Sequence, residues 1–284
     1  MLPTFVIGLR EGVEASLIVG IIAAFLNQRG GTRMLRWVWI GVITAVVLCA
    51  GAAVALQIVN SNLPQRQQEQ LETVVALIAV AMVTWMIVWM ARNARTLKAH
   101  LEQQADAAMA DGSGFALVVM AFLAVLREGL ETAVFLLAAF QASTNRAAAS
   151  AGALLGILVA VAIGYGIYRG GVRINLGRFF TATGLVLVLV AAGLVSFAFH
   201  TGHEAGWINF GQERALDLSW LIRPGTVQSA LFTGVLGIQP KPTVIEVVGW
   251  LFYVVPVSII VLASARRKPK PRPRPAAADD LAPA

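Results

Sequence analysis

Seven long apolar stretches, separated by polar segments, dominate the sequence. A window of about 19 residues places them at approximately 4–26, 37–59, 73–91, 115–140, 148–168, 179–199 and 244–263. Each is long enough to cross a bilayer core of about 30 Å as a helix. With 58% hydrophobic and 13% charged residues and a mean hydropathy of +0.74, the chain is unlike an ordinary soluble domain. The sequence therefore predicts an all-α polytopic membrane protein with seven transmembrane helices.

Basic residues are unevenly distributed between the two sides of this predicted bundle. The first, third and fifth loops and the tail together hold fifteen Lys and Arg residues, whereas the other side holds five. The positive-inside rule then predicts a plasma (inner) membrane protein with its N-terminus outside and its C-terminus in the cytoplasm. The basic, Pro-rich tail at 266–284 is predicted to be disordered and to lie near anionic lipid.

One six-residue motif occurs twice in the chain. LREGVE at 9–14 returns as LREGLE at 126–131, an offset of 117 residues. The same offset carries the second apolar stretch onto the fifth and, roughly, the third onto the sixth. Because each repeat has three helices, the second repeat is inverted in the membrane relative to the first. Transporters of this kind bind their substrate near the midplane, where equivalent helices meet. The predicted parts of the transmembrane domain, 1–265, are repeat one (about 1–95), repeat two (about 115–200), an external loop (200–243) and a seventh, C-terminal helix (244–263).

Each copy of the motif places an arginine and two glutamates in the middle of an apolar stretch. On a helix the three side chains of one copy point into the same sector. A charged group at this depth costs from about 3 to more than 10 kcal/mol when it faces lipid, so we expect all of them to face the bundle interior. Buried ion pairs that join two helices explain the arginines, but four carboxylates leave two charges for protons or cations to neutralise. The six residues are Arg10, Glu11, Glu14, Arg127, Glu128 and Glu131.

The converging carboxylates predict an all-oxygen cation site. Such ligands suit hard cations, and ferric iron, ferrous iron, Mn²⁺, Mg²⁺ and Ca²⁺ all fit this chemistry. The alternatives are a transporter of another divalent cation, such as Mn or Pb, and a membrane scaffold or enzyme with buried Arg–Glu pairs. The sequence has no phosphate-binding loop, hydrolase triad or nucleotide fingerprint. We therefore expect a transporter that is not an enzyme and has neither a bound organic cofactor nor a nucleic-acid partner.

The paired motifs resemble the REGLE motifs of the high-affinity iron permease family, which has fungal and bacterial members. Seven spans, an external N-terminus and motifs in the first and fourth spans also match, so the resemblance covers about residues 1–265. It differs at Val13, where the motif usually has Leu. The resemblance implies import of iron, as Fe²⁺ or Fe³⁺, with the four motif glutamates as ligands and the two arginines holding them in position. It also implies extracytoplasmic partners, namely an iron-binding protein and a haem peroxidase or oxidase.

Two further groups near the predicted outer surface are candidates for a metal relay. Glu69 and Glu72 have a spacing that puts both on one helical face, although acidic residues in a first helical turn also stabilise the helix dipole. The external loop begins with His200, His203 and Glu204, which together could pass a metal inward. The same loop continues as WINFGQERALDLSWL, and this pattern predicts an amphipathic surface helix over 207–221.

Overall fold

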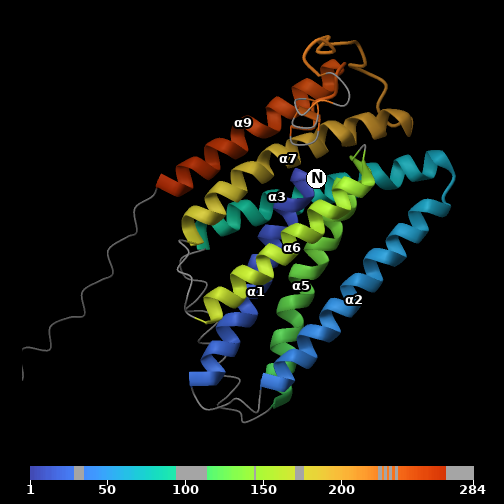
Figure 1. Cartoon of the computed structure of the whole chain (residues 1–284). Coiled ribbons are helices and arrows are strands. Elements are labelled where there is room, and N and C mark those ends of the chain that lie inside the picture. The colour runs from blue at the N-terminus through green and yellow to red at the C-terminus, as the bar shows by residue number, and fades with distance from the viewer. Residues whose placement is uncertain are drawn as a thin grey trace, which may run out of the picture.

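The computed structural model is all-helical apart from loops over the residues that it describes. These are 1–28, 35–93, 114–143, 145–169, 176–222 and 236–266, with Thr226, Ser229, Phe232 and Thr233 between the last two segments. Of the predicted tail only Arg266 is described, and it ends the last helix; the rest lies outside the described residues. The seven long helices in this part of the chain (Figure 1) are α1 (Leu2–Gln28), α2 (Leu35–Asn62), α3 (Gln65–Asn93), α5 (Gly114–Gln141), α6 (Arg146–Tyr168), α7 (Leu176–Glu204) and α9 (Val244–Arg266).

Each helix contains one of the seven predicted apolar stretches and extends beyond it at one or both ends. α3, for example, begins at Gln65, eight residues before the apolar stretch that starts at 73. Hydropathy marks only the part of a helix that can face hydrocarbon, whereas polar turns continue the same backbone hydrogen bonding into water. The apolar pattern therefore predicts the existence and order of these helices better than their ends.

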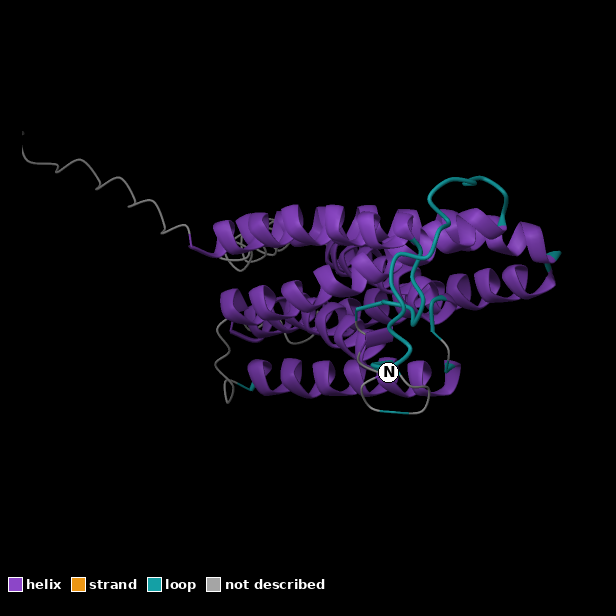
Figure 2. Ribbon diagram, turned by 90° about the horizontal axis from the view of Figure 1, so that it is seen from above, coloured by secondary structure: helices purple, strands orange, loops and turns teal. Residues whose placement is uncertain are grey.

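Helices α1 and α5, which carry the two motifs, lie at the centre of the bundle. α1 packs most extensively on α6, α5 packs most extensively on α2, and α1 and α5 also contact each other. α7 packs on α3 and on α9, while α3 touches α5 and α7 touches α1. In Figure 1, α9 lies on the outside of α7, and α2 lies at the opposite edge of the molecule. Figure 2 shows the described loops mainly at the end of the bundle opposite the C-terminal end of α9.

The glycine of each motif allows a neighbouring helix to approach closely. A side chain at Gly12 in α1 would collide with Ala160 of α6, and one at Gly129 in α5 would collide with Cys49 of α2. Small residues at such positions let helix backbones pack together in a membrane, where there is little hydrophobic drive for association. The motif glycines thus hold α6 and α2 directly against the two helices that carry the charges.

Five helices are long and apolar enough to cross a membrane, namely α2, α3, α6, α7 and α9. The two central helices, α1 and α5, are not in this set, and each contains the three charged residues of its motif. The outer helices expose large apolar side chains, among them Val47 on α2, Leu158 on α6 and Phe252 on α9. Such an extensive exposed apolar surface is typical of lipid contact.

The predicted surface helix over 207–221 is wrong. This segment consists of bends and turns, with an isolated antiparallel bridge between Arg214 and Thr243. Gly206 and Gly211 have positive φ angles of 80° and 70°, which a right-handed helix does not contain. The backbone N–H of Ala215 donates to the carbonyl of Pro242 at 3.0 Å instead of bonding within the segment. The loop is therefore stabilised by pairing with the chain that enters α9.

Candidate metal site

Three motif glutamates converge between the two central helices. Glu11 of α1 and Glu128 and Glu131 of α5 each offer a carboxylate oxygen, and these oxygens lie within 4.8 Å of one another. Oxygen ligands lie about 2.1 Å from a first-row divalent cation, so two that face each other across the ion are about 4.2 Å apart. The limit of 4.8 Å slightly exceeds this separation, so the three oxygens lie near the spacing of ligands around one ion. It is the only such group of three or more ligands in the described part of the chain.

The carboxylates at this site are buried and incompletely hydrogen-bonded. Glu11, Glu14 and Glu128 are only 1%, 4% and 4% exposed. Within the described part of the chain, each of them has one buried carboxylate oxygen without a hydrogen-bond partner. Leaving a buried polar oxygen without a partner costs about 1–3 kcal/mol, and more when the group is charged. A cation or protons must therefore balance these oxygens when the protein is folded.

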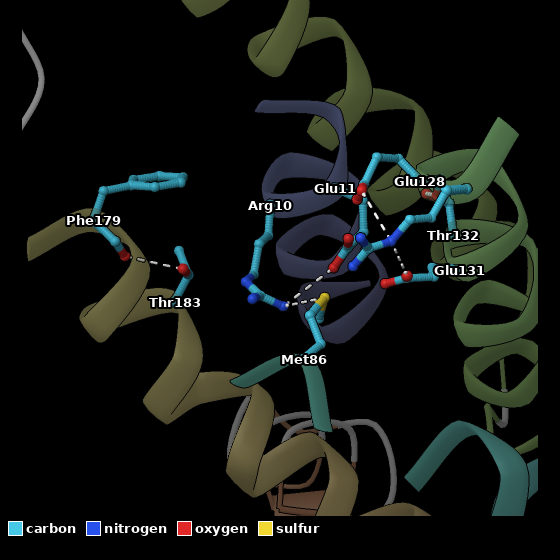
Figure 3. A network of polar contacts seen from close by, with 9 residues as sticks. Arg10, Glu11, Met86, Glu128, Glu131, Thr132, Phe179 and Thr183 are labelled. Carbon is cyan, nitrogen blue, oxygen red and sulfur yellow. Dashed lines mark hydrogen bonds and ion pairs between the residues drawn. The ribbon is translucent and has the colours of Figure 1, made fainter. Parts of the chain in front are cut away.

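Arg10 of α1 is fully buried, and its side chain contacts α3 and α7. Its Nη1 donates to Glu11 Oε1 at 3.3 Å and to the Met86 sulfur at 3.0 Å. Its guanidinium carbon lies 5.9 Å from the centre of the Phe180 ring, which is within range of a cation–π interaction. Figure 3 shows the side chain extending from α1 toward Met86, with Glu11 on the side of the other glutamates. Arg10 thus fixes one carboxylate and is itself held by two uncharged side chains.

Arg127 holds the two glutamates of α5. Its Nε lies 3.1 Å from Glu131 Oε1, where it donates a hydrogen bond, and 3.7 Å from Glu128 Oε1. Its side chain is 53% exposed, however, and it rests against the Trp89 ring of α3 at 5.6 Å. The expectation that all six motif charges face the interior is therefore wrong for Arg127. Trp89 covers only part of the guanidinium, whereas α3 and α7 enclose Arg10.

Glu14 differs from the other motif glutamates in its position. It is buried in α1, but its oxygens do not belong to the group within 4.8 Å. The structure thus brings three of the four predicted ligands together and places the fourth, three residues along α1 from Glu11, outside that group. Glu14 stays a predicted ligand, and one of its buried carboxylate oxygens has no hydrogen-bond partner among the residues that the structure describes.

The predicted outer relay residues do not form one cluster with three ligands. Glu69 accepts a hydrogen bond from Gln65 at 3.0 Å, and Glu72 accepts one from Gln68 at 3.2 Å. α3 has no acidic residue in its first turn, so the alternative that these glutamates stabilise the helix dipole there is wrong. His203 is exposed, and its Nδ1 lies 2.8 Å from the backbone oxygen of Ile208.

His200 has a partner that the sequence reading missed. Its Nδ1 lies 3.1 Å from Oε1 of Glu246, a buried residue in the first turn of α9, and its Nε2 lies 3.5 Å from Glu204 Oε1. Glu246 Oε2 also accepts the backbone N–H of Thr243 at 3.1 Å. A Thr followed three residues later by Glu before an apolar run is a helix-capping signal, and it could have drawn attention to Glu246.

Comparison with known proteins gives a consistent result. Residues 1–267 match the iron permease FTR1 family. The chain is 43% identical over 258 residues to the ferrous iron permease EfeU of Escherichia coli O157:H7, covering 90% of this chain and 93% of the relative. It is 40% identical over 262 residues to the ferrous iron permease EfeU of Yersinia pestis, covering 92% and 93%. No solved structure matches the chain.

Proposed function

Because the chain belongs to the iron permease FTR1 family, whose members are transporters, we propose that it imports iron through the central glutamate site. The family and the five apolar helices make it a multi-pass membrane protein. The observation that carries the proposal is the convergence of Glu11, Glu128 and Glu131 within 4.8 Å. An extracytoplasmic iron-binding protein and a haem peroxidase or oxidase remain proposed partners.

We propose ferrous iron as the transported ion. The relatives are named ferrous iron permeases, and the charges at the site agree with a divalent cation. When all are ionised, the four motif glutamates and the two motif arginines sum to a charge of −2. One divalent ion neutralises that charge, whereas a ferric ion leaves the site positive. Mn²⁺ carries the same charge and prefers similar ligands, so it is the strongest expected competitor.

Uptake by purified protein in liposomes tests this proposal. We expect radioactive iron to accumulate when it is kept ferrous by a reductant, and much less when it is supplied as a ferric chelate. Excess Mn²⁺ is expected to reduce uptake more than equal excesses of Mg²⁺ or Ca²⁺, because Ca²⁺ takes about six to eight oxygen ligands and Mg²⁺ gives up its water molecules reluctantly. Accumulation no greater than in protein-free liposomes, for both forms of iron, would contradict the proposed function.

The packing of the helices supports a 3+3 inverted repeat followed by one further helix. Exchanging α1 with α5, α2 with α6 and α3 with α7 carries each main packing pair onto another: α1–α6 corresponds to α5–α2, and α3–α5 to α7–α1. The pairs α1–α5 and α3–α7 correspond to themselves, as pairs on a two-fold axis do. The seventh helix, α9, packs on α7 and has no equivalent among the described helices.

Individual contacts also follow this correspondence. A side chain at Gly41 of α2 would collide with the carbonyl oxygen of Val118 in α5, and one at Gly152 of α6 would collide with that of Met1 before α1. Val118 is 117 residues after Met1, and Gly152 is 111 residues after Gly41. The first offset is the one that relates the two motifs. Matched contacts of this kind arise when two halves share one fold, and inverted halves provide the alternating access of many transporters.

Cysteine labelling tests the inverted arrangement and its orientation together. In a Cys49→Ala background, we expect Asn62→Cys, at the end of α2, and Arg146→Cys, at the start of α6, to react with a membrane-impermeant maleimide in intact cells. Arg169→Cys, which follows α6, is expected to react only after the membrane is permeabilised. Arg146 and Arg169 are both exposed and flank the same helix, so each serves as the control for the other. Labelling of Arg169→Cys in intact cells would reverse the proposed orientation. Labelling of only one of Asn62→Cys and Arg146→Cys in intact cells would contradict the inversion.

A further inference from the structure

A second group of potential metal ligands lies far from the motifs in the sequence, where α7 ends and α9 begins. His200 and Glu204 are one turn apart near the C-terminal end of α7, and Glu246 is in the first turn of α9. The loop between these helices brings Glu246 back beside His200, with 3.1 Å between its Oε1 and the imidazole Nδ1. The pairing therefore depends on the fold and cannot be seen from local spacing.

Glu246 holds the His200 ring in one orientation. Its own side chain is only 4% exposed, and its second oxygen is fixed by the backbone N–H of Thr243 at 3.1 Å. A carboxylate next to Nδ1 favours the tautomer that carries the proton there, which leaves the Nε2 lone pair free for a metal. This carboxylate–histidine arrangement commonly orients histidine ligands in metal sites.

The free side of the imidazole faces a second carboxylate. His200 Nε2 lies 3.5 Å from Glu204 Oε1, and the two side chains are 50% and 46% exposed. Ligand atoms each about 2.1 Å from a metal are about 3 Å apart in an octahedral site and about 3.4 Å apart in a tetrahedral one. The observed separation is close to these values, and the exposure leaves room for water molecules as further ligands.

A cavity connects this position with the central helices. Its volume is about 260 Å³, and its lining includes His200 and Glu246 together with Thr4 of α1 and Ala139 of α5. α1 and α5 are the helices that carry the two motifs, and Thr4 lies seven residues before Glu11. An ion held at His200 is therefore at the edge of a space that extends toward the helices of the central site.

We propose that His200 Nε2 and the Glu204 carboxylate form an entry site for a divalent first-row metal ion, with Glu246 as the residue that positions the imidazole. Imidazole and carboxylate together suit Fe²⁺, and two protein ligands bind a metal weakly enough to release it. Metal binding here is independent of the central site, whereas the role of the site in entry rests on the proposed permease function. The alternative is a simple ion pair between protonated His200 and Glu204.

Binding of Co²⁺ tests the site without requiring transport. The purified protein carries Glu11→Gln, Glu14→Gln, Glu128→Gln and Glu131→Gln, so that all four predicted central ligands are lost, and its elution on gel filtration verifies the fold. We expect one Co²⁺ per chain, detected by its visible absorption. His200→Ala or Glu204→Gln should weaken binding at least about 10-fold, and Glu246→Gln by about 10-fold to 100-fold, the range for residues that orient a metal ligand. His203→Ala is the matched control, because His203 contacts the Ile208 carbonyl and should leave binding unchanged.

Several outcomes would overturn the entry site. One is that folded His200→Ala and Glu204→Gln proteins bind Co²⁺ with unchanged affinity. Another is that His203→Ala weakens Co²⁺ binding as much as His200→Ala does. With the central glutamates intact, His200→Ala is expected to raise the Fe²⁺ concentration for half-maximal uptake severalfold and to leave the maximal rate unchanged. Co²⁺ binding as described in a protein that accumulates no iron would contradict the permease function alone. Normal iron uptake with no Co²⁺ binding at His200 would contradict the entry site alone.

Discussion

Glu131→Gln is expected to reduce iron accumulation in proteoliposomes to the level of protein-free liposomes, with the protein still inserted and folded. Glu131 is one of the three converging glutamates and accepts the hydrogen bond from Arg127 Nε at 3.1 Å. Glutamine keeps the size of the side chain and an acceptor oxygen for Arg127, but it removes one negative charge from the site. The remaining charges then no longer balance a divalent ion, and each 1.4 kcal/mol lost in binding weakens affinity about tenfold.

Glu72→Gln is a suitable control for the loss of a glutamate. Glu72 is also helical and accepts a hydrogen bond from a neighbouring side chain, Gln68, but it lies near the start of α3 and outside the converging group. We expect this variant to keep the wild-type maximal rate of iron accumulation at saturating iron, which a residue of the predicted outer relay does not set. Glu14→Gln is expected to abolish uptake as Glu131→Gln does, if the ion occupies a second position beside Glu14. Normal uptake by Glu131→Gln would remove that residue from the ligands.

Much of the fold follows from hydropathy alone. A helix that crosses a membrane must satisfy its own backbone hydrogen bonds and present apolar side chains to lipid. Its position along the chain can therefore be predicted from a run of consecutive apolar residues. The motif charges could be predicted as a site because they contradict this pattern twice, at matching places. That reasoning predicted the burial of Glu11, Glu14, Glu128 and Arg10, which are at most 4% exposed.

The parts that sequence reasoning missed depend on contacts between distant segments. The segment over 207–221 has an amphipathic pattern, but its backbone groups bond to the chain before α9. Glu246 lies in an apolar stretch of the sequence, and only the fold brings it beside His200. The exposure of Arg127 likewise depends on how fully α3 covers α5, and no local pattern encodes that. Two nearly identical motifs can therefore have different surroundings.

The two motif arginines should differ in their effect on stability. Arg10→Ala is expected to destabilise the protein by about 3–5 kcal/mol, the usual loss when one member of a buried ion pair is removed. The Arg10 side chain is 1% exposed, and its removal leaves Glu11 buried without its countercharge. Arg127→Ala is expected to destabilise the protein less, because the Arg127 side chain is 53% exposed and its ion pairs with Glu128 and Glu131 are less completely buried.

Thermal unfolding in detergent, followed by the loss of the monodisperse gel-filtration peak, measures this difference. We expect a clearly lower midpoint for Arg10→Ala than for Arg127→Ala, although both occupy the same position of the motif. Adding Glu11→Gln to Arg10→Ala should recover part of the loss, because the double variant no longer buries an unpaired charge. Equal midpoints for the two single variants would show that burial of Arg10 contributes no more to stability than the half-exposed Arg127. A double variant less stable than Arg10→Ala would instead show that Glu11 is stabilised by groups other than Arg10.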